Sequence, residues 1–114
     1  MLKFATVLAF LFTATNSFAA EVGEFFSPIG DSVKVDYQPD GRYLVTIDTW
    51  KNGATCHFEK MMDEVEEGDL RYESGICQLR VLQTTETTLS VSEWSCEQFC
   101  EEGVNLRITR AVRD

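Results

Sequence analysis

Apolar and polar residues alternate over most of the chain beyond residue 31, which is the pattern of β-strands with one buried face. In the stretch 32–37, Val33, Val35 and Tyr37 share a face, and the next run repeats the pattern. These segments are also rich in the β-branched and aromatic residues that pleated sheets favour. The pattern predicts strands at 32–37, 42–50, 54–61, 70–73, 76–83, 87–92 and 105–112, with Phe25 and Phe26 in an N-terminal strand.

Turn signals separate these segments. Pro39 and Gly41 lie between the first two runs, where proline presets φ and glycine accepts a positive φ. Asn52 and Gly53 form the dipeptide preferred in tight hairpins. Short strands at near-regular spacing predict a single all-β domain of about seven strands. Its chain would run as an antiparallel meander that closes into a sandwich or a barrel.

Two segments interrupt the alternation. The stretch 59–73 is dense in acidic residues, and Gly68 marks a loop tip within it. The stretch 95–103 suits a short helical segment, because Ser95 and Gln98 have the spacing of a capping box and Gly103 suits the position after a helix. We therefore expect an acidic hairpin and one short helical segment within the β-domain.

The first residues have the three parts of an export signal. Lys3 supplies a positive charge, residues 4–12 are apolar, and Ser17 and Ala19 occupy the positions of a cleavage site. The apolar run is shorter than the roughly 20 residues that a membrane-spanning helix needs. The sequence predicts a signal peptide at 1–19, a mature domain at 20–114, and a periplasmic location. A buried N-terminal helix is the alternative.

Charge narrows the choice of partners. The whole chain has 10 basic and 19 acidic residues, and removing residues 1–19 takes away Lys3 alone, which leaves a net charge near −10. A domain with this negative charge is not expected to bind nucleic acid or anionic membrane surfaces, and a basic protein is the more favourable partner. Acidity also simply aids solubility. No cofactor is indicated, and a homodimer stays open.

Four cysteines remain in the predicted mature chain. An even number in a short exported protein indicates two disulfides. A metal site is the weaker alternative, because His57 is the single histidine and no C-x-x-C pair is present. Three pairings are open, and on a helix Cys96 and Cys100 would need some distortion to bond each other. The cysteines are Cys56, Cys77, Cys96 and Cys100.

Several short motifs resemble small bacterial envelope proteins similar to the LprI-type lysozyme inhibitors. The motifs are Cys56-His-Phe-Glu59, 70–79 (LRYESGICQL), Leu89-Ser-Val, and Cys96-x-x-x-Cys100. The resemblance covers about 56–110 and implies the pairings 56–77 and 96–100. The chain departs from the pattern at Glu101, where a glycine would stand, and no aromatic residue closes the last strand near Arg110. It has only Ser74-Gly75 of the Ser-Gly-x-Gly-x-x-Tyr loop of other bacterial lysozyme inhibitors.

The chain also resembles, in kind, the periplasmic immunity proteins that protect bacteria from cell-wall-degrading type VI secretion effectors. Both resemblances imply an inhibitor whose acidic loop occludes the active site of a peptidoglycan hydrolase, such as a lysozyme-like muramidase, with electrostatic steering of association. The expected partner-binding acids are Asp63, Glu64, Glu66, Glu67 and Asp69, with Trp50 and Trp94 as interface anchors.

Plainer interpretations stand beside these. The acidic run is more often a solvated hairpin, and either tryptophan is more often at the edge of a core. His57 alternates with Cys56 and Phe58, which predicts an exposed strand residue. We expect no enzymatic activity. Nucleophilic catalysis needs an activated Ser or Cys with a base, whereas His57 is the single histidine and the cysteines are expected to form disulfides. The alternative function is a non-inhibitory structural or small-ligand-binding envelope protein.

Overall fold

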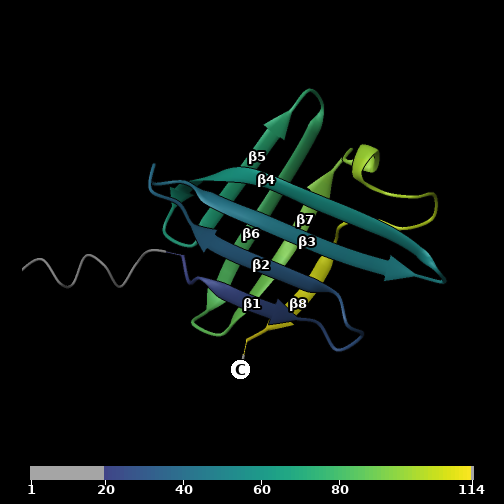
Figure 1. Cartoon of the computed structure of the whole chain (residues 1–114), viewed down its shortest axis with the longest axis horizontal. Coiled ribbons are helices and arrows are strands. Elements are labelled where there is room, and N and C mark those ends of the chain that lie inside the picture. Colours follow the sequence, from purple (N-terminus) through teal and green to yellow (C-terminus); the bar gives the residue numbers. More distant parts are fainter. Residues whose placement is uncertain (1–19, 114) are drawn as a thin grey trace, which may run out of the picture.

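The computed structural model describes residues 20–113, and the predicted signal peptide lies outside this range. The described chain forms a closed barrel of eight strands, each antiparallel to the next in sequence (Figure 1). The strands are β1 (Gly23–Phe26), β2 (Ser32–Tyr37), β3 (Tyr43–Lys51), β4 (Ala54–Glu66), β5 (Asp69–Ser74), β6 (Cys77–Thr85), β7 (Thr88–Trp94) and β8 (Ile108–Val112).

The barrel interior is filled by one cluster of apolar side chains, as expected for a barrel of only eight strands. Alternation along β3 sends Tyr43, Val45 and Ile47 inward, and each of them is buried. Phe25 of β1 is fully buried, which confirms the predicted N-terminal strand. Tyr37 shares the predicted face of Val33 and Val35 but is exposed, because it ends its strand at the rim.

One end of the barrel carries both disulfides, and we call it the disulfide end. It comprises the β1–β2, β3–β4 and β5–β6 loops together with the long connection from β7 to β8, residues 95–107. That connection lies across the end, where Phe99 packs edge-to-face on Phe58 and Tyr72. Hydrogen bonds from Glu101 N to Thr55 O, 2.9 Å, and from Thr49 Oγ1 to Asn105 O, 2.7 Å, hold it to the β3–β4 hairpin.

The disulfides join Cys56 to Cys100 and Cys77 to Cys96. The implied pairings 56–77 and 96–100 are therefore wrong, although the number of disulfides is right. Cys100 has an extended backbone and forms an isolated antiparallel bridge with Cys56, at a Cα–Cα distance of 4.0 Å. Cys96 follows the end of β7 and lies beside the start of β6, which brings its Cα 4.6 Å from that of Cys77.

The predicted helical segment is reduced to a single 3-10 turn, η2 (Glu97–Phe99). The capping box does not form: Cys96 precedes the turn and makes no side-chain cap. Ser95 instead has a positive φ of 59°, which turns the chain sharply out of β7. Gly103 has a positive φ of 91° but lies beyond the turn, because Cys100 already ends it in extended backbone.

The opposite end carries the β2–β3, β4–β5 and β6–β7 turns and both ends of the described chain. Residues 20–22 lie across it, since Ala20 N donates to Glu64 on β4 and Glu21 N donates to Gln83 on β6. Only one residue pair, Phe26 with Val112, joins β1 to β8 in the sheet. Arg113 reinforces this seam by donating to Val22 O and pairing with Glu21.

Two strand boundaries differ from the sequence prediction by more than two residues. β4 continues to Glu66 rather than ending at residue 61, so most of the acidic segment belongs to a regular strand. β8 begins only at Ile108, because Asn105 and Leu106 belong to the connection that covers the disulfide end. The total of eight strands includes the predicted N-terminal one.

Candidate functional site

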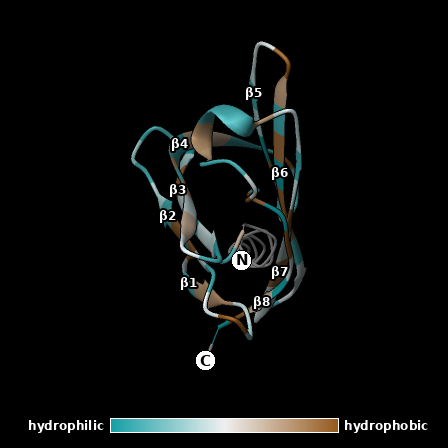
Figure 2. Ribbon diagram, turned by 90° about the vertical axis from the view of Figure 1, so that its right-hand side faces the viewer, coloured by the Kyte–Doolittle hydropathy of each residue, from teal (hydrophilic) through white to brown (hydrophobic). Residues whose placement is uncertain are grey.

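Large apolar side chains are exposed on the loops and strand ends of the disulfide end. Ile76, at the tip of the β5–β6 hairpin, is 77% exposed, and Trp94, at the end of β7, is 73% exposed. Trp50 and Ile29 are 51% and 65% exposed, and the indole of Trp50 lies against Gly30, beside Ile29. In Figure 2 the apolar tip of the β5–β6 hairpin stands clear of the rest of the barrel.

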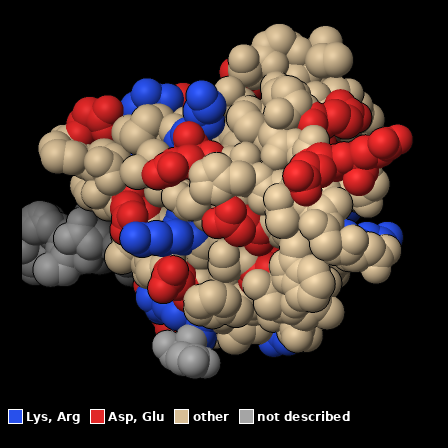
Figure 3. All heavy atoms as spheres, turned by 45° about the vertical axis from the view of Figure 1, so that its right-hand side comes forward, with Lys and Arg blue, Asp and Glu red and all other residues tan. Residues whose placement is uncertain are grey.

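Acidic residues accompany these apolar ones. Glu97, Glu101 and Glu102 of the β7–β8 connection are exposed, and so is Glu73 near the tip of β5. Figure 3, which brings this side of the molecule forward, shows acidic side chains gathered at its right-hand edge. Apolar anchors within a polar surround are the usual arrangement of protein–protein contact surfaces.

The predicted acidic site lies elsewhere, at the opposite end. Glu66 and Glu67 are exposed at the β4–β5 turn, and Asp63 is exposed but paired with Arg42 at 2.8 Å. β4 extends over 13 residues, on the order of 40 Å at the usual rise per residue. The acids and the two tryptophans predicted to act together are therefore at opposite ends of the barrel.

The β4–β5 turn does not project as a loop. Gly68 is buried, with a φ of +75°, and its carbonyl accepts a 2.7 Å hydrogen bond from Gln83 N. A Cβ at this position would lie 3.0 Å from the Cβ of Gln83. The turn is thus packed down on β6, whereas the β3–β4 and β5–β6 hairpins reach outward (Figure 1).

Two more of the predicted acids have partners within the chain. Glu64 accepts hydrogen bonds from Ala20 N at 3.0 Å and Gly68 N at 2.9 Å. Asp69 is only 2% exposed, and both of its oxygens accept forked hydrogen bonds from Arg71 and Arg80, at 2.8 to 3.1 Å. Hydrogen bonds from Arg71 lower the pKa of Asp69, against the opposing effect of burial, and Asp69 in turn raises the pKa of Arg71.

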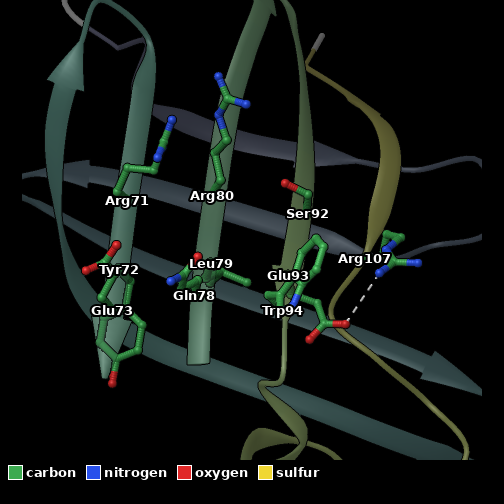
Figure 4. Close-up of a pocket in the computed structure, with 10 residues that line it drawn as sticks. All are labelled: Arg71, Tyr72, Glu73, Gln78, Leu79, Arg80, Ser92, Glu93, Trp94 and Arg107. Atoms are coloured by element: carbon green, nitrogen blue, oxygen red, sulfur yellow. Dashed lines mark ion pairs between the residues drawn. The ribbon is translucent and has the colours of Figure 1, made fainter. Parts of the chain in front are cut away.

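These arginines border a hollow of about 350 Å³ on the outer face of β5, β6 and β7 (Figure 4). Trp94 forms its lower part in that view, and Arg107 closes one side while pairing with Glu93 at 3.7 Å. Arg71 and Arg80 are held in place by Asp69 but remain partly exposed. In Figure 4 the fixed guanidinium groups of Arg71 and Arg80 point to the upper end of the hollow, whereas the exposed indole of Trp94 lies at its lower end beside Arg107.

Sequence reasoning missed the arginines of this hollow. Arg71 and Arg80 are direct cross-strand neighbours in the β5–β6 hairpin, with Ser74–Cys77 as its closing pair. A signal was present, because any hairpin centred on Gly75 and Ile76 places residues 71 and 80 opposite each other. Arg107 lies in the connection rather than in a strand, and no pattern in the sequence indicated its position.

His57 is exposed on β4 while Cys56 and Phe58 are buried, which confirms the prediction for this residue. Its Nδ1 lies 2.6 Å from Asp48 Oδ1, and its Nε2 lies 3.7 Å from Glu59 Oε1. The hydrogen bond to Asp48 raises the pKa of His57 above its usual 6.5. Among the described residues, no group of three or more His, Cys, Asp or Glu side chains could hold a metal ion.

No protein-family model, curated protein or solved structure matches this chain. The part of the chain that the structure describes contains no helix long and apolar enough to cross a membrane. The two disulfides are typical of a protein that matures in an oxidising compartment outside the cytoplasm. The class of protein that fold and site define is thus a disulfide-bonded, acidic eight-stranded barrel with a filled interior.

Proposed function

We propose that the protein is a periplasmic inhibitor or immunity protein that binds and occludes a peptidoglycan-degrading enzyme, either a lysozyme-like muramidase or a type VI secretion effector. The observation that carries the proposal is the exposure of four large apolar side chains and several carboxylates at the same end of the barrel, the disulfide end. Because the barrel interior is filled, binding has to use the outer surface.

The disulfide end suits an enzyme cleft in shape and in charge. Its projecting β5–β6 hairpin, with Ile76 at the tip, can enter a groove, and Trp94 lies at the end of the neighbouring strand. Glu73, Glu97 and Glu102 would then face the rim of the cleft. Peptidoglycan is anionic, so the clefts of its hydrolases tend to be basic, and acidic groups at the contact would speed association.

The proposal moves the expected contact away from the β4–β5 turn. Glu66 and Glu67 stay candidates for long-range steering because they are exposed. Asp69 and Glu64 already bind groups of their own chain, so we assign them no direct contact with the partner.

The test is inhibition of cell-wall hydrolysis. The exported protein would be titrated into basic muramidases and amidases acting on purified peptidoglycan, at low and high salt. We expect stoichiometric loss of activity of at least one enzyme, with affinity that weakens as salt rises. Unchanged hydrolysis by every enzyme at micromolar excess, with no binding by calorimetry, would contradict the proposal.

A second candidate function rests on the hollow beside Trp94. A hollow with guanidinium groups fixed by Asp69 at one end and an exposed indole at the other suits a ligand that carries an anionic group at some distance from a flat or sugar ring. This would make the protein a ligand-binding envelope protein. Saturable binding of soluble muropeptides, lost in Arg80→Ala and without effect on any hydrolase, would favour it over inhibition.

A further inference from the structure

The backbone nitrogen of Ala20 is bound by a carboxylate. Ala20 N donates to Glu64 Oε2 at 3.0 Å, and Ala20 itself is 8% exposed and packed within the core cluster. The next residue is also fixed, because Glu21 N donates to Gln83 Oε1 at 2.8 Å. The backbone at Ala20 is thus held at a defined point of the opposite end.

Glu64 is oriented for this contact by its strand. It continues the inward alternation of Phe58 and Met62 on β4, so its carboxylate lies at the mouth of the barrel. It also accepts hydrogen bonds from Gly68 N at 2.9 Å and from Tyr43 Oη at 3.4 Å. Burial and the charge of Glu64 raise the pKa of Tyr43 to about 12, so the phenol stays a neutral donor.

The charge of Glu64 is not balanced by the donors around it. All three are neutral, and none of the ion pairs found among residues 20–113 includes Glu64. A half-buried carboxylate without a counter-charge is unfavourable, and a glutamine could accept the same hydrogen bonds. Ala20 is also the residue that would become the N-terminus on cleavage after Ala19.

We infer that Glu64 is a receptor for the α-ammonium group created when the chain is cut between Ala19 and Ala20, and that processing converts a neutral hydrogen bond into an ion pair that locks the barrel. Hydrolysis of this peptide bond by a signal peptidase consumes one water and leaves a carboxylate on Ala19. The amine left on Ala20 takes up a proton at neutral pH.

This inference rests on the export step of the proposed function and on no partner. It also sets an order of events, because the buried Ala20 is out of reach once the barrel has formed. Cleavage therefore comes first and docking of the new N-terminus follows. The seam between β1 and β8 has a single ladder pair, and an ion pair between Ala20 and Glu64 would also tie the segment that leads into β1 to β4.

The test is a thermodynamic cycle on the processed chain, which contains every strand of the barrel. Glu64→Gln is made in a chain that begins at Ala20 and in a chain that retains residues 17–19, where the ammonium is displaced. We expect Glu64→Gln to lower Tm by about 4–8 °C more in the first chain than in the second. Glu64→Gln alters the hydrogen bonds from Gly68 and Tyr43 equally in both chains, so their effect on Tm cancels when the two losses are compared.

Glu66→Gln is the matched control, since Glu66 is an exposed acid on the same strand and should behave alike in both chains. Should Glu64→Gln fail to fold, acetylation of the Ala20 amine in the unmutated chain gives the same comparison, with a lower Tm expected. Equal losses in both chains, or an unchanged Tm on acetylation, would overturn the inference. So would N-terminal sequencing of the exported protein that finds a first residue other than Ala20.

Discussion

The two ends of the barrel are closed in different ways. At the disulfide end, the 95–107 connection crosses the opening and is held covalently to β4 and β6. At the opposite end, residues 20–22 cross the opening and are held by hydrogen bonds to Glu64 and Gln83. The covalent closure coincides with exposed tryptophan and isoleucine side chains, and the polar closure coincides with most of the acidic segment.

The difference teaches how a small barrel can expose apolar residues and stay folded. A domain of this size buries a modest core, so exposed Trp94 and Ile76 would tend to collapse onto it. Disulfides fix the surrounding backbone and keep such side chains outward. The opposite end also exposes apolar side chains, Tyr37 and Val65 among them, but these are less exposed than Ile76 and Trp94, and this end is closed by hydrogen bonds rather than by disulfides.

The largest expected effect comes from removing the disulfides. Cys56→Ala with Cys100→Ala opens a loop of sequence separation 44, and Cys77→Ala with Cys96→Ala opens one of 19. Loop entropy predicts losses of about 4 and about 3 kcal/mol in the free energy of unfolding. Urea denaturation measures both losses. A larger loss on removing the Cys77–Cys96 bond than on removing the Cys56–Cys100 bond would contradict the loop-entropy argument. Peptide mapping that found 56–77 or 96–100 bonds would contradict the structure itself.

At the opposite end, Asp69→Asn should be the most damaging single change. The substitution replaces the charge-assisted hydrogen bonds from Arg71 and Arg80 by weaker ones. We expect the free energy of unfolding, measured by chemical denaturation, to fall by about 2 kcal/mol. Asp63→Asn is the matched control, because its ion pair with Arg42 is exposed and should contribute less than about 0.5 kcal/mol. Equal effects of the two substitutions would show that burial of Asp69 adds nothing.

The lowered pKa of Asp69 also predicts how the stability of the fold depends on pH. The pKa of Asp69 is lowered below its usual 3.8 in the folded protein, so its contribution is complete above the unfolded value. It is lost as the pH falls from about 4 through the folded pKa. Asp69→Asn should therefore flatten the stability profile below about pH 4. A profile of unchanged slope would contradict this assignment.

Alanine substitutions at Gly68, in the β4–β5 turn, and at Gly53, in the β3–β4 turn, allow the turns of the two ends to be compared directly. Both have a positive φ, +75° and +85°, but a Cβ at Gly68 meets Gln83 at 3.0 Å while one at Gly53 meets nothing within 4 Å. We expect Gly53→Ala to cost about 1 kcal/mol and Gly68→Ala about 1 kcal/mol more. Similar losses in thermal or urea unfolding would mean that the β4–β5 turn is not packed on β6.

The smallest effect concerns His57, near the disulfide end. Because Asp48 raises the pKa of His57, the stabilisation is complete below pH 6.5 and is lost as the pH rises through the folded pKa. The pair is exposed, so the change in stability should be below about 0.5 kcal/mol. The NMR titration midpoint of His57 should fall in Asp48→Asn, and an unmoved midpoint would exclude the pair in solution.

Much of the fold could be predicted because strand alternation is a local property of the sequence. Val45 and Ile47 point inward as their spacing requires, and Asn52-Gly53 turns the chain between β3 and β4. Closure into a barrel, by contrast, depends on the pairing of Phe26 with Val112, two residues at opposite ends of the domain. No local pattern carries that information.

The candidate site was harder to predict because it depends on which loops share an end. Acidic residues between 59 and 73 are close together in sequence, which suggested one acidic loop, but β4 continues to Glu66, and Asp69 begins β5 paired with two arginines. The cysteine pairing that the resemblance implied is wrong because the backbone at Cys100 is extended and pairs Cys100 with Cys56, a contact that the residues alone had left open among three pairings.

The central claim is that the disulfide end, rather than the acidic turn, contacts the partner enzyme. The most direct measurement is the affinity of three variants for an inhibited hydrolase: Trp94→Ala, the double charge reversal at Glu66 and Glu67, and Val65→Ser, an exposed apolar control at the opposite end. We predict a loss of about 30-fold or more for Trp94→Ala, a small salt-dependent loss for the charge reversal, and none for Val65→Ser. Unchanged binding by Trp94→Ala together with abolished binding by the charge reversal would contradict the account.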